Sequence, residues 1–245
     1  MLPLVYLGGF WFAGLILIAT GIAAWEMVNM HDNLVKIPTW IKTLAITATL
    51  GITFAPDLLM AWSILGAHSL FLWLIYALKK MDTKTASFYT ITLIYIGFAF
   101  RSLMEIRQLS LTLFIFLIAI VIITDSMAYF AGRFFGKHKL APKISPKKTI
   151  EGAIGGWLSG AIFAVAFGLA NNLFTETWVL IVLAVCLPIL SQIGDLVASA
   201  LKRKYEIKDF SNIFPGHGGV MDRVDSQLLA GILIYVVLYF GGLGG

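Results

Sequence analysis

The stretch Leu109 to Ala131 reads LSLTLFIFLIAIVIITDSMAYFA, an apolar run with one carboxylate, Asp125, towards its end. A run of about 20 apolar residues, coiled as a helix, crosses the roughly 30 Å hydrocarbon core of a bilayer. An ionised carboxylate inside such a helix is costly unless it is paired, hydrated or bound to a metal. The stretch therefore predicts a transmembrane helix, with Asp125 as a functional candidate.

The apolar character of this stretch extends over the whole chain. Of its 245 residues 59% are hydrophobic and 13% are charged, whereas soluble domains carry about 25% charged residues. Hydropathy places apolar helices near residues 4–24, 41–55, 58–78, 86–100, 109–131, 152–172, 178–200 and 226–242. We therefore expect an all-α, polytopic integral membrane protein with about eight transmembrane helices. The stretches 41–55 and 86–100 are short, so counts of about seven or nine stay open.

The basic residues are distributed unequally between the two sides of such a bundle. When successive loops alternate sides, all of the 18 Lys and Arg residues except Arg101 and Arg107 fall on one side. The positive-inside rule assigns the basic side to the cytoplasm and both termini to the outside. The net charge of +5 is then a consequence of membrane topology, and we expect no nucleic-acid partner. The predicted location is the cell (inner) membrane, with a polar site open to the cytoplasmic face.

The sequence favours a single membrane-embedded domain over residues 1–245, because it contains no convincing internal repeat or low-complexity tract. The polar residues concentrate in residues 124–225, which we expect to carry the site. The first apolar run ends in Ala-Ala-Trp-Glu and leads into an ordinary loop. We interpret it as a membrane helix and not as a cleavable signal peptide.

Asp125 belongs to a polar face of its predicted helix. Tyr129 and Arg133 follow it at i+4 and i+8, which places the three side chains on one side of the helix. A second polar stretch, Ser145-Pro146-Lys147-Lys148, resembles an N-cap followed by Pro at the first helical position. Such a helix start would direct free backbone N–H groups and two lysines at one place, which is typical of a phosphate site.

The lysines of the second stretch also have a simpler interpretation. Lys147 and Lys148 would serve as interfacial anchors that contact lipid head groups. Glu151 would then be their pairing partner and take no part in chemistry. The sequence leaves both interpretations open.

A third polar stretch lies inside the apolar segment 178–200. Ser191, Asp195 and Ser199 share one stripe of the predicted helix. Asp195 precedes Lys202 by about 10 Å along a helix, so we expect it just below the cytoplasmic surface. A metal or a substrate could reach it from that side.

Carboxylates and cations alternate between this helix and Asp225. The carboxylates are Asp195, Asp222 and Asp225, and the cations are Lys202, Arg203, Lys208 and Arg223. Phosphoryl or nucleotidyl transfer needs both kinds, oxygen ligands for Mg²⁺ and cations for phosphate oxygens. Internal salt bridges would account for Asp209 or Asp225, but poorly for Asp195 inside a span. We expect Asp195 and Asp222 to bind a metal.

The glycines around His217 predict a turn just before Asp222. In Pro215-Gly216-His217-Gly218-Gly219 the turn either brings backbone close to a phosphate or lets the loop re-enter the fold. His217 could be a hydrogen-bond donor, an acid or a space-filling side chain. The sequence does not decide between these roles.

The segment from Ser199 to Asp225 resembles the defining motif of the phosphatidate cytidylyltransferases, or CDP-diacylglycerol synthases. The matching residues are Ser199, Leu201-Lys202-Arg203, Lys208-Asp209-Phe210, Pro215-Gly216-His217-Gly218-Gly219, Asp222-Arg223 and Asp225. Ser145 to Gly152 resembles a second segment of the family. The N-terminal half is similar mainly in hydropathy, with Tyr6 to Phe12 resembling an early helix. Family members commonly carry a further apolar helix before that point, so the N-terminal topology stays open.

The resemblance implies transfer of CMP from CTP to phosphatidate in the membrane, giving CDP-diacylglycerol and pyrophosphate. It implies Mg²⁺, with K⁺ as a second ion, and metal binding at Asp195 and Asp222. The catalytic residues it implies are Asp195, Asp222, Lys202, Arg203 and Arg223. Together with the residue patterns above, it gives the substrate-binding candidates Asp125, Lys147, Lys148, Lys208, His217 and Ser199. It also implies a homodimer, which close helix packing at Gly152, Gly155, Gly156 and Gly160 could support. The same glycines could equally pack within one chain.

Three other functions were weighed against this one. CTP transfer to another membrane lipid phosphate, such as an isoprenoid-ether lipid, would use the same nucleotide chemistry. Asp125 and Asp195 could instead mark an ion path in a transporter, but few polar residues lie towards the outer face. A phosphoalcohol transferase would need a paired aspartate motif within one helix, which the sequence lacks.

Overall fold

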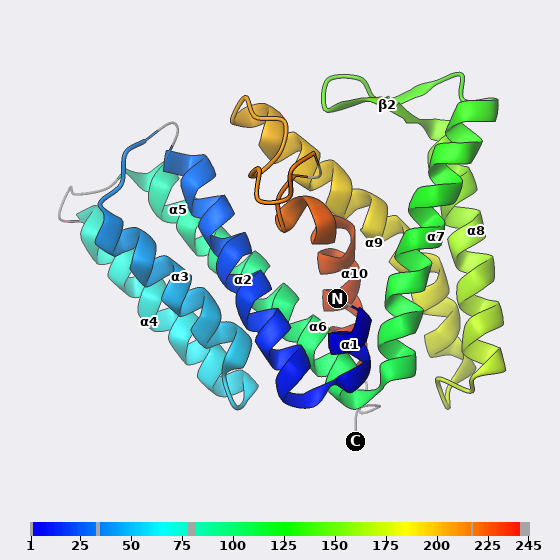
Figure 1. Ribbon diagram of the computed structural model, residues 1–245, viewed down its shortest axis with the longest axis horizontal. Helices are drawn as coiled ribbons and strands as arrows, with labels where there is room; N and C mark the ends of the chain where they lie inside the picture. The colour runs from blue at the N-terminus through cyan, green and yellow to red at the C-terminus, as the bar shows by residue number, and fades with distance from the viewer. Residues whose placement is uncertain (1, 33–34, 78–81, 217, 241–245) are drawn as a thin grey trace. The chain divides into compact units, whose positions relative to one another are not determined.

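The computed structural model describes residues 2–32, 35–77, 82–216 and 218–240, and it is built almost entirely from helices (Figure 1). The helices are α1 (Leu2–Leu7), α2 (Gly9–Asp32), α3 (Thr39–Phe54), α4 (Leu58–Ala77), α5 (Thr83–Thr92), η1 (Leu93–Gly97), α6 (Phe98–Leu109), α7 (Leu111–Phe135), α8 (Ile150–Ala170), α9 (Thr177–Lys204) and α10 (Met221–Phe240). Two short strands, β1 (Lys139–Ala141) and β2 (Ser145–Thr149), pair antiparallel as a hairpin between α7 and α8. The predicted all-α class is confirmed, with this hairpin as an addition.

Among the described residues, six stretches of helix are long and apolar enough to cross a membrane, which confirms a multi-pass membrane protein. They are Gly9–His31, Leu58–Ala77, Thr83–Leu109, Leu111–Phe135, Ile150–Ala170 and Thr177–Lys204. Each of the predicted spans overlaps a helix, but α3 has 16 residues, or about 24 Å at 1.5 Å per residue. The count of about eight crossings stays a prediction.

Several helix boundaries differ from those that hydropathy predicts, and two of the differences have a clear local cause. The first predicted span is divided at Gly8, whose φ of 66° separates α1 from α2. The span predicted at 109–131 begins only at Leu111, because Ser110 caps α7 by accepting a hydrogen bond from the Leu113 N–H at 3.3 Å. Hydropathy averages over a window, so it does not detect a single φ or a single capping side chain.

The chain forms two compact units, each completed by a segment from further along the sequence. The first unit consists of Met1–Met104 and Tyr205–Arg223, and the second of Glu105–Lys204 and Val224–Gly245. In the first, α2, α3, α4 and α5 pack beside one another, and in the second α7, α8 and α9 do so (Figure 1). The single-domain organisation expected from the sequence stays a prediction.

Buried polar contacts close the first unit. Arg101 is buried, and its guanidinium donates to the carbonyl oxygen of Ala55 at 2.6 Å, just past the end of α3. The last carbonyl groups of a helix lack partners within it, and a cation there also complements the helix dipole. Arg101, one of the two basic residues outside the cytoplasmic set, is thus a buried residue of the fold. His31 of α2 shares hydrogen bonds with Tyr205 at 2.9 Å and Thr85 at 3.0 Å.

Glycines allow α7 and α8 of the second unit to pack closely. A methyl group at Gly156 would lie 2.6 Å from the carbonyl oxygen of Thr124 and 2.7 Å from Cβ of Ala128. At Gly160 it would meet the hydroxyl of Thr124 and the ring of Pro188. These approaches require glycine, because any larger residue overlaps the neighbouring helix. The glycine face is therefore covered within the chain, the second of the two alternatives that the sequence left open.

Side-chain hydrogen bonds tie α8 to α9 near Pro188. The Gln192 amide donates to the carbonyl oxygen of Ala153 at 3.2 Å, and the Trp157 indole donates to that of Val185 at 3.1 Å. Pro188 lacks an N–H and lies within α9, where it interrupts the backbone ladder. These bonds fix α9, and with it Asp195, against α8.

Candidate functional site

The predicted site residues of the second unit meet where β2 approaches α9. The Lys148 ammonium forms an ion pair with the Asp195 carboxylate through Oδ2. The two side chains are 28% and 30% exposed, so both groups are accessible from outside. Ser199, one turn further along α9, donates to Asp195 Oδ1 over a long 3.4 Å. The predicted Ser191–Asp195–Ser199 stripe is thus part of one helix, and Asp195 has a lysine partner.

The local structure that positions Lys148 is a strand, and the predicted helix start at Ser145-Pro146 is wrong. Proline disfavours helix at the residue before it and is tolerated in edge strands. The helix begins instead at Ile150, where Thr149 accepts a hydrogen bond from the Gly152 N–H at 3.1 Å as its N-cap. Because side chains alternate along a strand, Lys147 is exposed while Lys148 turns towards Asp195.

Glu151 holds the beginning of the hairpin. Its carboxylate accepts hydrogen bonds from the backbone N–H groups of Lys137 at 3.0 Å and His138 at 3.2 Å, and pairs with the His138 ring at 2.6 Å. At the turn, the Arg203 guanidinium donates to the carbonyl oxygen of Ile144 at 3.3 Å. Both contacts fix the hairpin that carries Lys148. The predicted catalytic residue Arg203 therefore also has a structural contact.

Three carboxylates from three helices interact around Asp195. Asp125 of α7 interacts electrostatically with Asp195 and Lys148, and the Ser226 side chain lies near it. Asp225 of α10 interacts with Asp195, Asp125 and the ammonium of Lys202. The close approach of α9 to α10 depends on Gly194, because a methyl group there would overlap the carbonyl oxygen of Asp225. The three negative charges repel one another, so binding of a cation among them is favourable.

The remaining residues of the second unit that the sequence singles out lie on α7, β2 and α9. Arg133 donates to the Tyr129 hydroxyl at 3.2 Å, which confirms their shared face on α7. Lys147 and Arg203 are exposed. We call the residues Asp125, Lys148, Asp195, Lys202 and Asp225 the charged cluster.

A separate polar arrangement surrounds Asp222 in the first unit. Asp222 lies in the first turn of α10, and its Oδ2 accepts hydrogen bonds from the backbone N–H groups of Phe210 at 2.8 Å and Gly219 at 3.0 Å. Gly218 has a φ of 76°, and a methyl group there would lie 2.8 Å from Asp222 Oδ2. The Phe214 N–H donates to the Gly218 carbonyl at 3.0 Å and closes the turn. The glycine-rich loop thus wraps around the Asp222 carboxylate.

Two other predicted residues close to Asp222 in the sequence are at the surface. Lys208 and Arg223 are exposed, and His217 lies outside the described residues. Within the ranges that the structure describes, no group of three or more His, Cys, Asp or Glu side chains could hold a metal ion. Metal binding at Asp195 and Asp222 stays a prediction.

One carboxylate of this region was missed by the sequence analysis. Glu26 of α2 is fully buried, and it accepts hydrogen bonds from the Ser211 hydroxyl and from the Val220 and Met221 backbone N–H groups. The predicted span 4–24 ends just before Glu26, which places it in a loop. The rule that an ionisable residue within an apolar helix marks a functional place would have found it.

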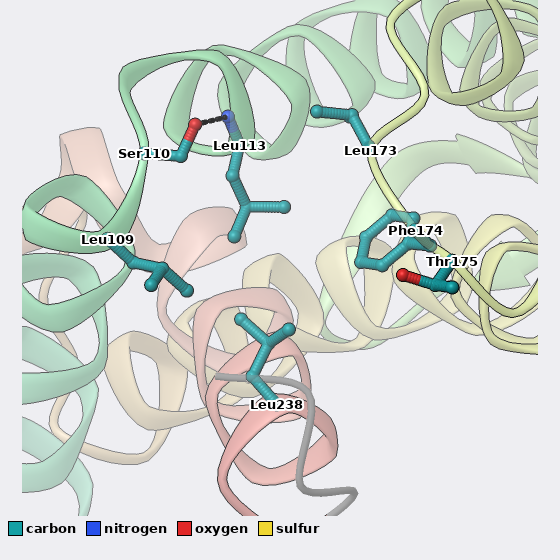
Figure 2. Close-up of a pocket in the computed structure, with 7 residues that line it drawn as sticks. All are labelled: Leu109, Ser110, Leu113, Leu173, Phe174, Thr175 and Leu238. Atoms are coloured by element: carbon teal, nitrogen blue, oxygen red, sulfur yellow. Dashed lines mark hydrogen bonds between the residues drawn. The ribbon is translucent and has the colours of Figure 1, made fainter. Parts of the chain in front are cut away.

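A pocket of the second unit lies at the beginning of α7, away from the turns that hold Asp125 (Figure 2). It measures about 180 Å³ and is lined by Leu109, Ser110, Leu113, Leu173, Phe174, Thr175 and Leu238. Its lining is apolar or hydroxyl-bearing, and Ser110 is engaged in capping α7. Because this lining contains no charged side chain, it does not suit a nucleoside triphosphate.

The fold and these two arrangements define a multi-pass membrane protein with clustered carboxylates and cations. Comparison with known proteins narrows the class. The model of the cytidylyltransferase family matches residues 1–240. The chain belongs to this family, whose members are nucleotidyltransferases.

Several curated relatives carry the same name. A phosphatidate cytidylyltransferase of Bacillus subtilis (strain 168) is 37% identical over 180 residues, which cover 71% of this chain and 67% of the relative. A phosphatidate cytidylyltransferase of Staphylococcus epidermidis (strain RP62A) is 33% identical over 244 residues, covering 97% and 93%. One of Staphylococcus aureus (strain COL) is 33% identical over 199 residues, covering 81% and 71%. The resemblance stated from the motif is confirmed.

Proposed function

We propose that the chain transfers CMP from CTP to phosphatidate, giving CDP-diacylglycerol and pyrophosphate for phospholipid synthesis. The relatives named for this activity support it over nearly the whole chain. The observation that carries the proposal is the partly exposed Lys148–Asp195 pair within the charged cluster. Ammonium groups suit phosphate oxygens, and carboxylate oxygens are the kind of ligand that Mg²⁺ takes, so the cluster contains both kinds of group that nucleotidyl transfer uses.

The chemistry needs no general base. The phosphate monoester of phosphatidate has a second pKa near 6, so it is largely dianionic at pH 7. One of its oxygens attacks the α-phosphorus of CTP, the new P–O bond forms, and the bond to the bridging oxygen of pyrophosphate breaks. The barrier is mainly the repulsion between two anions, which the cations of the site reduce and which positioning overcomes.

Mg²⁺ fits the donor chemistry of the carboxylates. Asp195 is accessible and already holds a cationic group, the Lys148 ammonium, and carboxylate oxygens are the ligands that Mg²⁺ takes in proteins. We assign metal-ligand roles to Asp195 in the second unit and to Asp222 in the first, each on its match to the family motif. Mg²⁺ would neutralise triphosphate charge and polarise the α-phosphorus, and K⁺ is the second ion implied by the family.

The basic residues would bind the phosphates of both substrates. Lys202, Arg203 and Arg223 are assigned to the triphosphate. We assign Asp125, Lys147, Lys148, Lys208, His217 and Ser199 to substrate contacts. Lys148 is the first residue to test among them, since its ammonium already pairs with Asp195.

The location of the reaction follows from the charge distribution. The basic side of the predicted topology is cytoplasmic, so we propose a cell (inner) membrane enzyme whose site opens to the cytoplasm, where CTP is present. Phosphatidate would then react without leaving the bilayer. A homodimer stays a proposal from the family resemblance, since the glycine face of α8 is covered by α7.

The test is product formation by the protein purified in detergent. CTP, Mg²⁺ and phosphatidate are added to wild type, Asp222→Asn and Asp57→Asn, and CDP-diacylglycerol and pyrophosphate are followed. Asp57 is the matched control, because it accepts a backbone hydrogen bond from Met60 at 2.7 Å at the start of α4. We expect equal amounts of both products from wild type and Asp57→Asn and none from Asp222→Asn. Turnover with an isoprenoid-ether lipid phosphate but not with phosphatidate would favour the alternative acceptor.

A further inference from the structure

Glu26 occupies a position that the proposed reaction does not use directly. Its Oε1 accepts from the Ser211 hydroxyl at 2.5 Å and the Val220 N–H at 2.9 Å, and its Oε2 accepts from the Met221 N–H at 2.8 Å. Both oxygens of a fully buried carboxylate are thus occupied by donors from one loop. The loop is the one that wraps around Asp222.

The contacts of Glu26 replace a missing helix cap. The first N–H groups of a helix need acceptors, which a Ser, Thr, Asp or Asn before the helix usually supplies. The residue before α10 is Val220, whose side chain contains no acceptor. Glu26, which belongs to α2, supplies one carboxylate oxygen to the Val220 N–H and the other to the Met221 N–H. Its negative charge is also favourable at a helix N-terminus.

Each of the two adjacent glycines of the loop approaches a different carboxylate, Gly218 that of Asp222 and Gly219 that of Glu26. A methyl group at Gly218 would lie 2.8 Å from Asp222 Oδ2. A methyl group at Gly219 would overlap the carboxylate of Glu26 and lie 2.6 Å from the Ser211 hydroxyl. The Gly219 N–H donates to Asp222 at 3.0 Å, so one peptide separates the two carboxylates. A shift of the loop at Glu26 would therefore displace a donor to Asp222.

We infer that Glu26 is a positioning residue, which fixes the loop so that the Asp222 carboxylate is held in one orientation. This inference rests on the proposed function, in which Asp222 is a metal ligand. Residues that orient a metal ligand commonly change metal affinity by about 10-fold to 100-fold when they are altered. Glu26 acts through backbone groups and does not contact substrate.

The test compares Glu26→Gln with two other variants of the first unit. The glutamine has the same shape, but its NH₂ would face a backbone donor and repel it. Ser211→Ala removes one donor and leaves Glu26 in place. Thr53→Val is the matched control, since Thr53 is buried and donates to the Thr49 and Gly97 carbonyls at 3.0 and 3.2 Å, away from the loop.

Two readouts are independent of turnover. The first is hydrogen exchange of the Val220 and Met221 amides in detergent, and the second is Mn²⁺ binding in the presence of CTP, measured by electron paramagnetic resonance. We expect Glu26→Gln to exchange these amides at least about 10-fold faster and to raise the Kd for Mn²⁺ about 10-fold. Ser211→Ala should show the same changes at about threefold, and Thr53→Val neither.

Each outcome bears on a different claim. Wild-type amide exchange and Mn²⁺ binding in Glu26→Gln, with Mn²⁺ binding lost in Asp222→Asn, would overturn the role of Glu26 and leave the proposed function intact. Undiminished Mn²⁺ binding in Asp222→Asn would overturn the metal-ligand role itself. If Glu26→Gln does not fold, Ser211→Ala decides, and unchanged exchange and binding in that variant would overturn the inference.

Discussion

Asp195 of the second unit and Asp222 of the first have different kinds of partner. In the second unit Asp195 pairs with a partly exposed lysine side chain. In the first, Asp222 and Glu26 accept hydrogen bonds mainly from backbone N–H groups of one loop. A lysine side chain can rotate away and admit another cation, whereas a backbone N–H moves only with its loop. We conclude that the Asp195 carboxylate can exchange its lysine partner for another cation, whereas the Asp222 carboxylate is held in a fixed orientation.

The largest effect is expected for Asp195→Asn. Loss of the charge leaves the Lys148 ammonium without its partner and removes a predicted metal ligand, so kcat should fall by at least about 100-fold. Ser199→Ala, which removes only a 3.4 Å contact to the same carboxylate, should lower kcat by less than about threefold. The measurement is CDP-diacylglycerol formation at saturating substrates. Comparable kcat values for both variants would contradict the assignment.

Neighbouring lysines of β2 provide a sharper comparison. Lys148→Met removes the ammonium at Asp195 and should raise the KM for CTP about 10-fold to 100-fold, the value of a charge-assisted contact. Lys147→Met removes the exposed neighbour, whose substrate contact is screened by solvent, and should raise the KM by a smaller factor, about threefold. The two lysines differ because side chains alternate along a strand. Equal changes of the KM for CTP in the two variants would therefore contradict the orientation of Lys148 towards Asp195.

A smaller effect is expected where the second unit depends on close packing alone. Gly156→Ala places a methyl group against Thr124 and Ala128, and such overpacking costs about 1–3 kcal/mol. The melting temperature in detergent should therefore fall by about 2–10 °C. Gly14→Ala, which has open space around it, should leave it unchanged or raise it slightly. A fall of the same size in Gly14→Ala would show that the glycine contacts are not the cause.

The smallest effect concerns an exposed carboxylate with a backbone partner. Asp82 caps α5 by accepting from the Thr85 N–H at 3.2 Å, and a hydrogen bond from the Thr85 side chain lowers the pKa of Asp82. Folding lowers the pKa of Asp82, so the ionised carboxylate stabilises the folded protein. This stabilisation is fully present above the pKa that Asp82 has in the unfolded chain, and it is lost as the pH falls through the pKa that Asp82 has in the folded protein. Asp82→Ala should cost about 0.5–1 kcal/mol near neutral pH. Thermal melts between about pH 6 and pH 3 should show the difference from wild type shrinking towards the acidic end; a constant difference would assign the effect to packing.

The sequence predicts the helical spans and the motif well because both depend on neighbouring residues. An apolar run of sufficient length determines a membrane helix, and the i+4 spacing of Asp195 and Ser199 determines their shared face. A cationic partner for Asp195 could be expected from the sequence, since a carboxylate within a membrane span needs a cation. That Lys148 is this partner could not be predicted, because Lys148 reaches Asp195 from a strand that the sequence does not indicate.

The features that the sequence missed depend on distant partners. Ser145-Pro146 satisfies the local pattern of a helix start, yet β2 forms because Thr149 pairs with Lys139 of β1. Glu26 meets Val220 at a separation of 194 residues, and nothing near Glu26 in the sequence indicates that contact. The two glycines Gly218 and Gly219 suggested a turn, but which carboxylates they approach follows only from the three-dimensional fold.

The most direct test of this account is Mn²⁺ binding in the presence of CTP by wild type, Asp195→Asn and Lys148→Met. If the Asp195 carboxylate exchanges the lysine for a metal, Asp195→Asn should lose Mn²⁺ binding, whereas Lys148→Met should bind Mn²⁺ at least as tightly as wild type. The lysine variant should nevertheless transfer CMP more slowly, because a phosphate contact is lost. Wild-type Mn²⁺ binding by Asp195→Asn would contradict the account.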